Sequence, residues 1–158
     1  MIQLMIQTAP FDTSAIIDSL FQSQTDVGAV VTFSGVVREF LSGETSENLL
    51  QGIELECYES MTYHYLEKIC REAQERWGLS QIYIVHRVGF LKLSEPIVFV
   101  GVSGAHRHQS FDGCCFLMDQ LKAFAPFWKK EVLLSGESHW VIAKEYDLAH
   151  AQKWCAAR

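Results

Sequence analysis

At 158 residues and 49% hydrophobic content, the chain is long enough to bury a sizeable core, and its length gives no case for more than one domain. The 13 Lys and Arg residues against 19 Asp and Glu residues leave a formal net charge of −6, which argues against duplex nucleic acid or an anionic membrane as a partner. We therefore expect one domain over residues 1–158, with any anion site confined to a local pocket.

The cysteines and the first residues predict a cytoplasmic location. Five cysteines are an odd number, and they lack the spacing of a disulfide framework. The segment after Met1 lacks the basic region and the long apolar region of a secretion signal. No run of residues approaches the roughly 18 apolar residues that are needed to cross a bilayer.

The first third of the chain predicts a helix, a strand and a loop. Asp12 or Thr13 can cap a short amphipathic helix that reaches Phe21, and the β-branched run 28–37 predicts a strand. Residues 39–51 combine Gly, Ser, Thr and acids without a period, which is typical of a loop. Closure of this loop over a substrate is a hypothesis that the sequence does not decide.

The middle of the chain predicts a strand followed by the longest helix. Residues 53–60 alternate apolar and polar side chains, the period of a strand with one wet face. An apolar stripe with charges on the other faces predicts a helix from Met61 to Trp77, and Gly78 is a stop signal.

The second half predicts two more strands, a helix and a hairpin. The strands cover 81–89 and 97–104, and residues 90–96 between them form a turn that ends at a proline. A helix from about Ser110 to Phe124 follows, with an apolar stripe of Phe111, Cys114, Cys115, Met118 and Leu121. Residues 131–146 resemble two strands around Ser135 and Gly136, so the elements favour an α+β fold over a doubly wound parallel sheet.

The segment "GVSGAHRHQSFDG" suggests an anion site. His106, Arg107 and His108 come where a strand ends and a helix begins, beside free backbone N–H groups that suit phosphate. A surface turn decorated with charges is an equally good interpretation. A zinc site of His106, His108 and Cys114 is disfavoured, because no second ligand pair stands at a recognised spacing.

The segment "LKAFAPFWKKE" places three lysines among aromatic residues. Lys122 extends the apolar helix face by one turn, whereas Lys129 or Lys130 would lie against a wall of Phe127 and Trp128. A lysine held against an apolar wall can act as an acid, a base or a nucleophile, although a packed stem with its ammonium in water is the commoner arrangement. Glu131 is positioned to orient one of them.

Two further groups have a structural and a chemical interpretation. Cys114 and Cys115 fall in the predicted helical stripe, so core packing is favoured over a thiol mechanism. Arg38 follows the strand at 28–37, where it can either join the anion pocket or form a salt bridge at its rim.

Six fragments taken together resemble the family of molybdopterin synthase large, catalytic subunits. The resemblance covers about residues 5 to 154, and the ordered set "GAHR", a helix ending in "LK", and "PFWKKE" is its most specific part. The fragments are "VTFSGVVR", "LECYESM", "HRVG", "VGVSGAHRHQSFDGCCFLMDQLK", "APFWKKE" and "HWV".

The resemblance implies an α/β-hammerhead-type fold with an added antiparallel subdomain and a sulfurtransferase activity. Such enzymes convert cyclic pyranopterin monophosphate into the molybdopterin dithiolene. The sulfur comes from the C-terminal thiocarboxylate of a small ubiquitin-like carrier subunit, and the large subunits form a homodimer within a heterotetramer. The resemblance implies no resident cofactor or metal. The alternative is a non-catalytic module that binds the tail of the carrier.

The resemblance also assigns residues by their position in the matched fragments. It implies that Lys122 and Lys129 are catalytic, and that the following residues bind the substrate or line its pocket: Arg38, His106, Arg107, Phe33, Met118 and Glu131. The chain departs from many relatives at Lys144, where they have arginine, and a lysine lacks the bidentate fork that binds anions.

Overall fold

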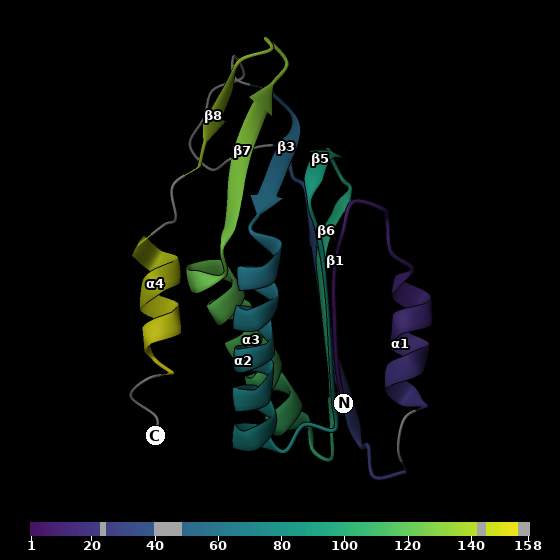
Figure 1. The fold of residues 1–158 in the computed structure, drawn as a ribbon. Coiled ribbons are helices and arrows are strands. Elements are labelled where there is room, and N and C mark those ends of the chain that lie inside the picture. The colour runs from purple at the N-terminus through teal and green to yellow at the C-terminus, as the bar shows by residue number, and fades with distance from the viewer. Residues whose placement is uncertain (23–24, 40–48, 142–144, 155–158) are drawn as a thin grey trace.

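The computed structural model describes residues 1–22, 25–39, 49–141 and 145–154, which form helices packed on two sheets (Figure 1). The first sheet has the strand order β1-β4-β6-β2, in which β1 is parallel to β4 and the other neighbours are antiparallel. Its strands are β1 (Ile2–Gln7), β4 (Gln81–Arg87), β6 (Pro96–Gly104) and β2 (Ala29–Val36).

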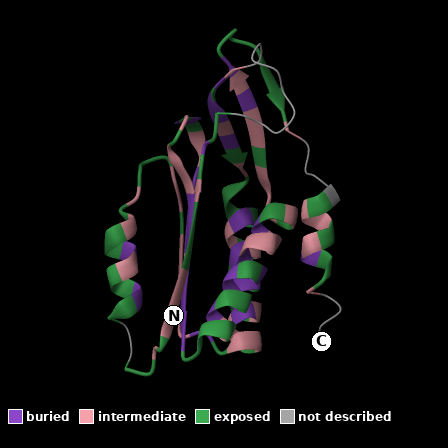
Figure 2. Ribbon diagram, turned by 180° about the vertical axis from the view of Figure 1, so that it is seen from behind, coloured by how far each residue is buried: buried purple, intermediate pink, exposed green. Residues whose placement is uncertain are grey.

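Helices cover both faces of this first sheet (Figure 1). α1 (Thr13–Phe21) lies on one face, where Leu20 packs with Phe99 of β6. α2 (Glu59–Trp77) and α3 (Arg107–Phe124) lie on the other face and form the largest apolar cluster with the strands, including Phe116 and Leu117. Figure 2 shows the buried residues of α2 and α3 facing the sheet, whereas α1 is exposed over most of its surface.

The second sheet is antiparallel and extends beyond the first at one end of the molecule (Figure 1). Its order is β5-β3-β7-β8, and its strands are β5 (Gly89–Lys92), β3 (Leu50–Cys57), β7 (Phe127–Leu133) and β8 (Ser138–Trp140). One face of β3 and β7 packs on a separate small core that includes Val37, Leu55 and Leu133. The last element, α4 (Glu145–Gln152), lies against α3.

Local signals explain where the helices begin and end. The Asp12 carboxylate accepts hydrogen bonds from the backbone N–H groups of Ser14 and Ala15, which caps α1 as predicted. Gly78 takes the left-handed conformation with φ 60° at the end of α2, also as predicted. Pro126 follows α3 closely, and β7 begins at the next residue.

The structure confirms the α+β prediction and corrects several details of it. β1, β5 and α4 were not predicted, and three of the four residues of β5 lie in the segment 90–96 that was predicted as a turn. α3 begins at Arg107 instead of Ser110, and β7 begins at Phe127, four residues before the predicted strand. Of the predicted loop 39–51, residues 40–48 lie outside the described residues, and β3 already begins at Leu50.

The predicted apolar stripe of α3 was partly wrong. Phe111 is 57% exposed and Cys115 is also exposed, whereas Gly113 and Phe116 are buried. A Cβ atom at Gly113 would lie 2.7 Å from the Leu79 side chain, which would have to shift to make room for it. Separately, none of the helices within the described ranges is long and apolar enough to cross a membrane.

Candidate functional site

The two adjacent lysines of β7 lie on opposite faces of the second sheet. Lys129 stands opposite Leu55 and shares its face with the small apolar core, whereas Lys130 points the other way. There Lys130 lies 3.8 Å from the Glu54 carboxylate and 5.5 Å from the centre of the Trp140 ring. Lys129 therefore faces the small core, whereas Lys130 contacts Glu54 and Trp140 on the outer face of the sheet.

Glu131 connects Lys129 with a histidine of the neighbouring strand. The Glu131 side chain is only 2% exposed, and its Oε1 lies 3.8 Å from the Lys129 Nζ atom. Its Oε2 lies 3.1 Å from Nε2 of His139, which pairs with Glu131 across β7 and β8. The prediction that Glu131 orients a lysine agrees with this ion pair, and His139 is a member that sequence reasoning missed.

Lys122 lies in the last turn of α3, one short connection before β7. Its side chain is 65% exposed, and its Nζ atom lies 3.8 Å from the carboxylate of Asp147 on α4. The sequence predicted that Lys122 extends the apolar face of the helix by one turn, and the exposed ammonium corresponds to the commoner arrangement of such a lysine. Both predicted catalytic lysines thus lie close together in the chain, around the junction of α3 and the second sheet.

Phe33 and Met118 lie at similar heights on neighbouring elements. The Ser110 hydroxyl donates a hydrogen bond to the Ala29 carbonyl, which fixes the start of β2 beside the start of α3. From this contact Phe33 is about 13 Å along β2, and Met118 is about 12 Å along α3. Phe33 is 41% exposed, and Met118 packs on the edge of the main core.

Arg38 follows β2 beside the small core beneath the second sheet. Its neighbour Val37 is 3% exposed and packs in the cluster that contains Ile53 and Leu55. Those two residues are the cross-strand partners of Glu131 and Lys129. Arg38 is exposed, and the structure therefore places it at the same end of the molecule as the lysines.

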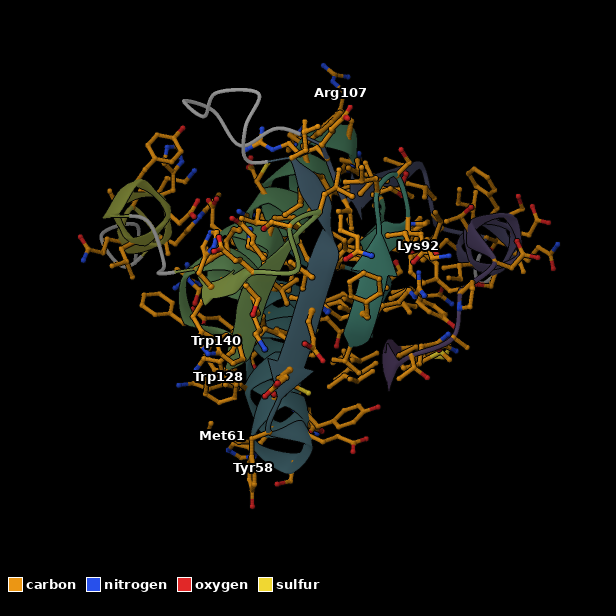
Figure 3. All side chains as sticks on the ribbon, turned by 90° about the horizontal axis from the view of Figure 1, so that it is seen from above. Tyr58, Met61, Lys92, Arg107, Trp128 and Trp140 are labelled. Carbon is orange, nitrogen blue, oxygen red and sulfur yellow. The ribbon has the colours of Figure 1, made fainter. Side chains whose placement is uncertain are left out.

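His106 and Arg107 lie at the opposite end of α3 from Lys122. His106 is the N-cap residue and Arg107 the first helical residue, so Arg107 precedes Lys122 by about 22 Å along the helix axis. Both side chains are exposed. Seen from above, Arg107 and Trp128 of β7 also lie on different sides of the molecule (Figure 3). One chain does not bring all the predicted site residues into one pocket.

The zinc alternative finds no support in the geometry. The rings of His106 and His108 are stacked with centroids 5.9 Å apart, and no group of three metal-ligating side chains occurs among the residues that the structure describes. Cys114 is buried, as predicted, and burial raises its pKa to about 12. The same prediction was wrong for Cys115, which is exposed on α3.

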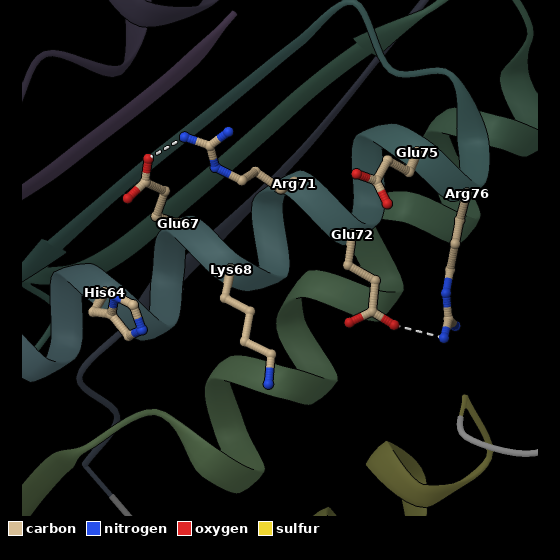
Figure 4. A pocket seen from close by; sticks show the side chains of 7 residues that line it. All are labelled: His64, Glu67, Lys68, Arg71, Glu72, Glu75 and Arg76. Carbon is tan, nitrogen blue, oxygen red and sulfur yellow. Dashed lines mark hydrogen bonds and ion pairs between the residues drawn. The ribbon is translucent and has the colours of Figure 1, made fainter.

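Two other surface features are a charged hollow on α2 and a group of large exposed side chains. A hollow along the polar face of α2 is lined by seven mostly charged residues, His64, Glu67, Lys68, Arg71, Glu72, Glu75 and Arg76 (Figure 4). Four of them form two ion pairs, Glu67 with Arg71 and Glu72 with Arg76, each 2.6 Å long. The partners in each pair are four residues apart, a common arrangement on the solvent-exposed face of a helix. Four large exposed side chains, Tyr58, Met61, Trp128 and Trp140, gather on one side of the molecule (Figure 3).

Comparisons with known proteins agree over nearly the whole chain. A model of the MoaE protein family matches residues 6–124. The molybdopterin synthase catalytic subunit of Pseudomonas aeruginosa is 44% identical over 151 residues, which cover 96% of this chain and 97% of that protein. The protein of the same name from Vibrio cholerae is 41% identical over 152 residues, covering 96% and 97%.

Solved structures give the same result. The molybdopterin biosynthesis MoaE protein from Burkholderia ambifaria superposes with a TM-score of 0.81 at 39% identity, covering 98% of this chain and 99% of that one. Molybdopterin synthase from Staphylococcus aureus gives a TM-score of 0.77 at 31% identity, covering 87% of this chain and 96% of that one.

Proposed function

Because this chain belongs to the MoaE protein family, whose matched relatives are molybdopterin synthase catalytic subunits, we propose that it inserts sulfur into a pterin to make molybdopterin. The substrate is cyclic pyranopterin monophosphate, and the sulfur donor is the C-terminal thiocarboxylate of a small ubiquitin-like carrier. The structural observation that best supports this proposal is the position of Lys129, which lies on the core-facing side of β7 beside the buried Glu131 carboxylate.

The reaction requires positive charge at two places. Attack of the thiocarboxylate sulfur on the pterin side chain opens the cyclic phosphate and leaves an acyl link to the carrier, which water then hydrolyses. Negative charge develops on the phosphate oxygens and on the acyl oxygen, and a fixed cation near each lowers the barrier. We assign Lys129 and Lys122 to these charges and to the proton transfers beside them.

The remaining predicted residues divide into two groups. Arg38, Phe33 and Met118 lie toward the lysine end of the molecule, where they would line the pterin pocket. His106 and Arg107 lie about 22 Å from Lys122 along α3 and cannot reach the same substrate within one chain. A homodimer that places the start of α3 from one chain beside the lysines of the other would complete the site.

The proposal needs no resident metal or cofactor, because the carrier brings both the sulfur and its nucleophilic charge. A thiol of this chain is not required either, which fits the burial of Cys114 away from solvent. A cytoplasmic location is part of the proposal, because the five cysteines lack the spacing of a disulfide framework. Lys144, the position that departs from many relatives, lies outside the described residues.

The test is single-turnover conversion of cyclic pyranopterin monophosphate with thiocarboxylated carrier. The wild-type protein should form molybdopterin, and Lys129→Ala and Lys122→Ala should lose roughly 100-fold or more while still binding the carrier. Lys130→Ala is the matched control, because Lys130 lies one residue away on the outer face, and it should keep nearly full activity.

Two results would overturn the proposal in different ways. Carrier binding without product by the wild-type protein would identify a docking module without chemistry. Equal losses in Lys129→Ala and Lys130→Ala would show that general surface charge, instead of a placed ammonium group, supports the reaction.

A further inference from the structure

We propose that His139 is a positioning residue for Lys129, acting through the buried Glu131 carboxylate so that sulfur transfer slows when the imidazole gains a proton. This inference rests on the proposed function and deepens it, because it adds a third member to the lysine site and gives the reaction a pH dependence. It follows from the three side chains on β7 and β8 and from their surroundings.

The register of the hairpin brings Glu131 and His139 together. Glu131 and His139 are directly opposite each other on β7 and β8, so their side chains share one face of the sheet. The His139 Nε2 atom lies 3.1 Å from Glu131 Oε2, within hydrogen-bond distance, whereas the ring itself is 50% exposed. His139 therefore touches solvent on one side and a 2% exposed carboxylate on the other.

The other carboxylate oxygen of Glu131 faces Lys129. Glu131 Oε1 is buried and accepts no hydrogen bond among the described residues, and the Lys129 Nζ atom lies 3.8 Å from it. A charge-assisted bond between the two would be about 2.8 Å long, so a movement of about 1 Å by the ammonium group completes it. Glu131 is thus shared by one cation and one titratable ring.

The other side chains that surround Glu131 on β3 and in the small core are apolar. On β3 the opposing residues are Ile53 and Leu55, which are apolar, and the remaining side chains of the small core are apolar as well. The charged pair Lys130 and Glu54 lies on the other face of the sheet. Lys122 at the end of α3 pairs with Asp147 of α4. Lys129 and His139 are therefore the charged or titratable groups that contact this carboxylate within the described residues.

The rate of sulfur transfer should fall as the pH falls. A histidine ordinarily changes its charge between about pH 5 and 8. Above this range the neutral ring donates one hydrogen bond, and the full negative charge of Glu131 holds the Lys129 ammonium in place. Below it the imidazolium, which is closer, neutralises the carboxylate. The attraction between this carboxylate and the Lys129 ammonium then weakens, and the transfer slows.

The test compares single-turnover rates at pH 5.5 to 8.5 for wild type, His139→Gln and His139→Arg. Gln keeps a hydrogen-bond donor without titrating, so its rate relative to wild type should rise roughly threefold to tenfold as the pH falls. Arg carries a permanent charge, so it should be slow by the same factor at pH 8.5. His64→Gln on the exposed face of α2 is the matched control and should follow the wild-type profile.

A second readout needs no substrate and separates this inference from the proposed function. The side-chain nitrogen resonance of Lys129 should differ between pH 5.5 and pH 8.5 in wild type, and this difference should be absent in His139→Gln. Product formation with a parallel pH profile in His139→Gln, or an unchanged Lys129 resonance in wild type, would overturn the role of His139 alone. Absence of any product from wild type would overturn the proposed function instead.

Discussion

The imidazole of His86 is stacked on the ring of Phe127, with centroids 3.7 Å apart and ring planes 15° from parallel. His86 belongs to β4 in the centre of the first sheet, and Phe127 is the first residue of β7 in the second. The contact therefore anchors the strand that carries Lys129 to the main core. Burial lowers the pKa of His86 to about 4, although its Nδ1 atom lies 2.8 Å from the Arg87 carbonyl oxygen.

This buried histidine should make the free energy of unfolding depend on pH. An unfolded histidine has a pKa near 6.5, so between about pH 6.5 and 4 the unfolded chain binds more protons than the folded one. The protein should lose about 3 kcal/mol of stability across this window as the pH falls. Urea unfolding at a series of pH values measures this loss, and His86→Phe, which keeps a stacked ring, should remove most of it.

The control for that measurement is His64→Gln, because His64 lies on the exposed face of α2. It should leave the slope of stability against pH unchanged. A His86→Phe variant with the wild-type slope would show that other groups cause the acid sensitivity.

The C-terminal helix should depend on Asp119. The Trp154 indole N–H donates a 2.7 Å hydrogen bond to Asp119 Oδ2, and the Lys153 ammonium lies 3.0 Å from the same oxygen. Asp119→Ala leaves both donors without this partner and should cost about 1–2 kcal/mol. Hydrogen exchange in α4 should rise in this variant. Asp112→Ala, an exposed change on the same helix, should leave exchange in α4 as it is in wild type.

Gly52 should tolerate no side chain. A Cβ atom at this position in β3 would lie against the Leu91 carbonyl oxygen of β5, and backbone atoms of a paired strand cannot move aside as a flexible side chain can. Gly52→Ala should therefore destabilise the protein by roughly 1–3 kcal/mol. Gln51→Ala, at the exposed neighbouring position, should change stability by less than about 0.5 kcal/mol. Similar midpoints of thermal unfolding for the two variants would contradict this account.

The sequence was sufficient to predict the elements whose start, end or period is set by residues within the element itself. The Asp12 cap, the alternation that begins at residue 53 and the Gly78 stop each act within a few residues, and each was predicted. The predicted strand 53–60 ran too far, because β3 ends at Cys57 and α2 begins at Glu59. β5 is four residues long and exists because it pairs with β3, more than thirty residues earlier, so no local pattern marks it. Phe111 was predicted to be in the core because it is apolar and has the spacing of the helical stripe, but it is exposed on α3.

The site was predictable as a set of residue types but not as an arrangement. No strand was predicted before residue 131, and only a strand at Lys129 places the side chains of neighbouring residues on opposite faces. The opposite orientations of Lys129 and Lys130 follow only from the pairing of β7 with β3. The role of His139 depends on the register of β8 in the same way.

The cysteines should differ sharply in reactivity with iodoacetamide. Cys115 is exposed, whereas Cys70 and Cys114 are buried and their burial raises both pKa values to about 12, which leaves almost no thiolate at neutral pH. Peptide mapping of the native protein should find Cys115 modified well before the other two. Equal rates for Cys114 and Cys115 would contradict the orientation of α3, and protection of Cys115 would indicate that a partner covers it.

The distance between Arg107 and Lys122 predicts complementation between inactive variants. If each site combines the start of α3 from one chain with the lysines of the other, then a mixed dimer of Arg107→Ala and Lys129→Ala contains one intact site. Random exchange of equal amounts should restore roughly a quarter of the wild-type activity from two variants that are each inactive. Activity is measured by the single-turnover assay after mixing and refolding.

The double variant Arg107→Ala with Lys129→Ala, mixed with wild type, is the control for this exchange. It places both defects on one chain, so in a mixed dimer each site lacks one group, and only the wild-type homodimers, roughly a quarter of the dimers, remain active. Failure of the single variants to complement, while carrier binding and dimerisation persist, would show that His106 and Arg107 act outside the lysine site. Their exposure at the far end of α3 would then require another explanation.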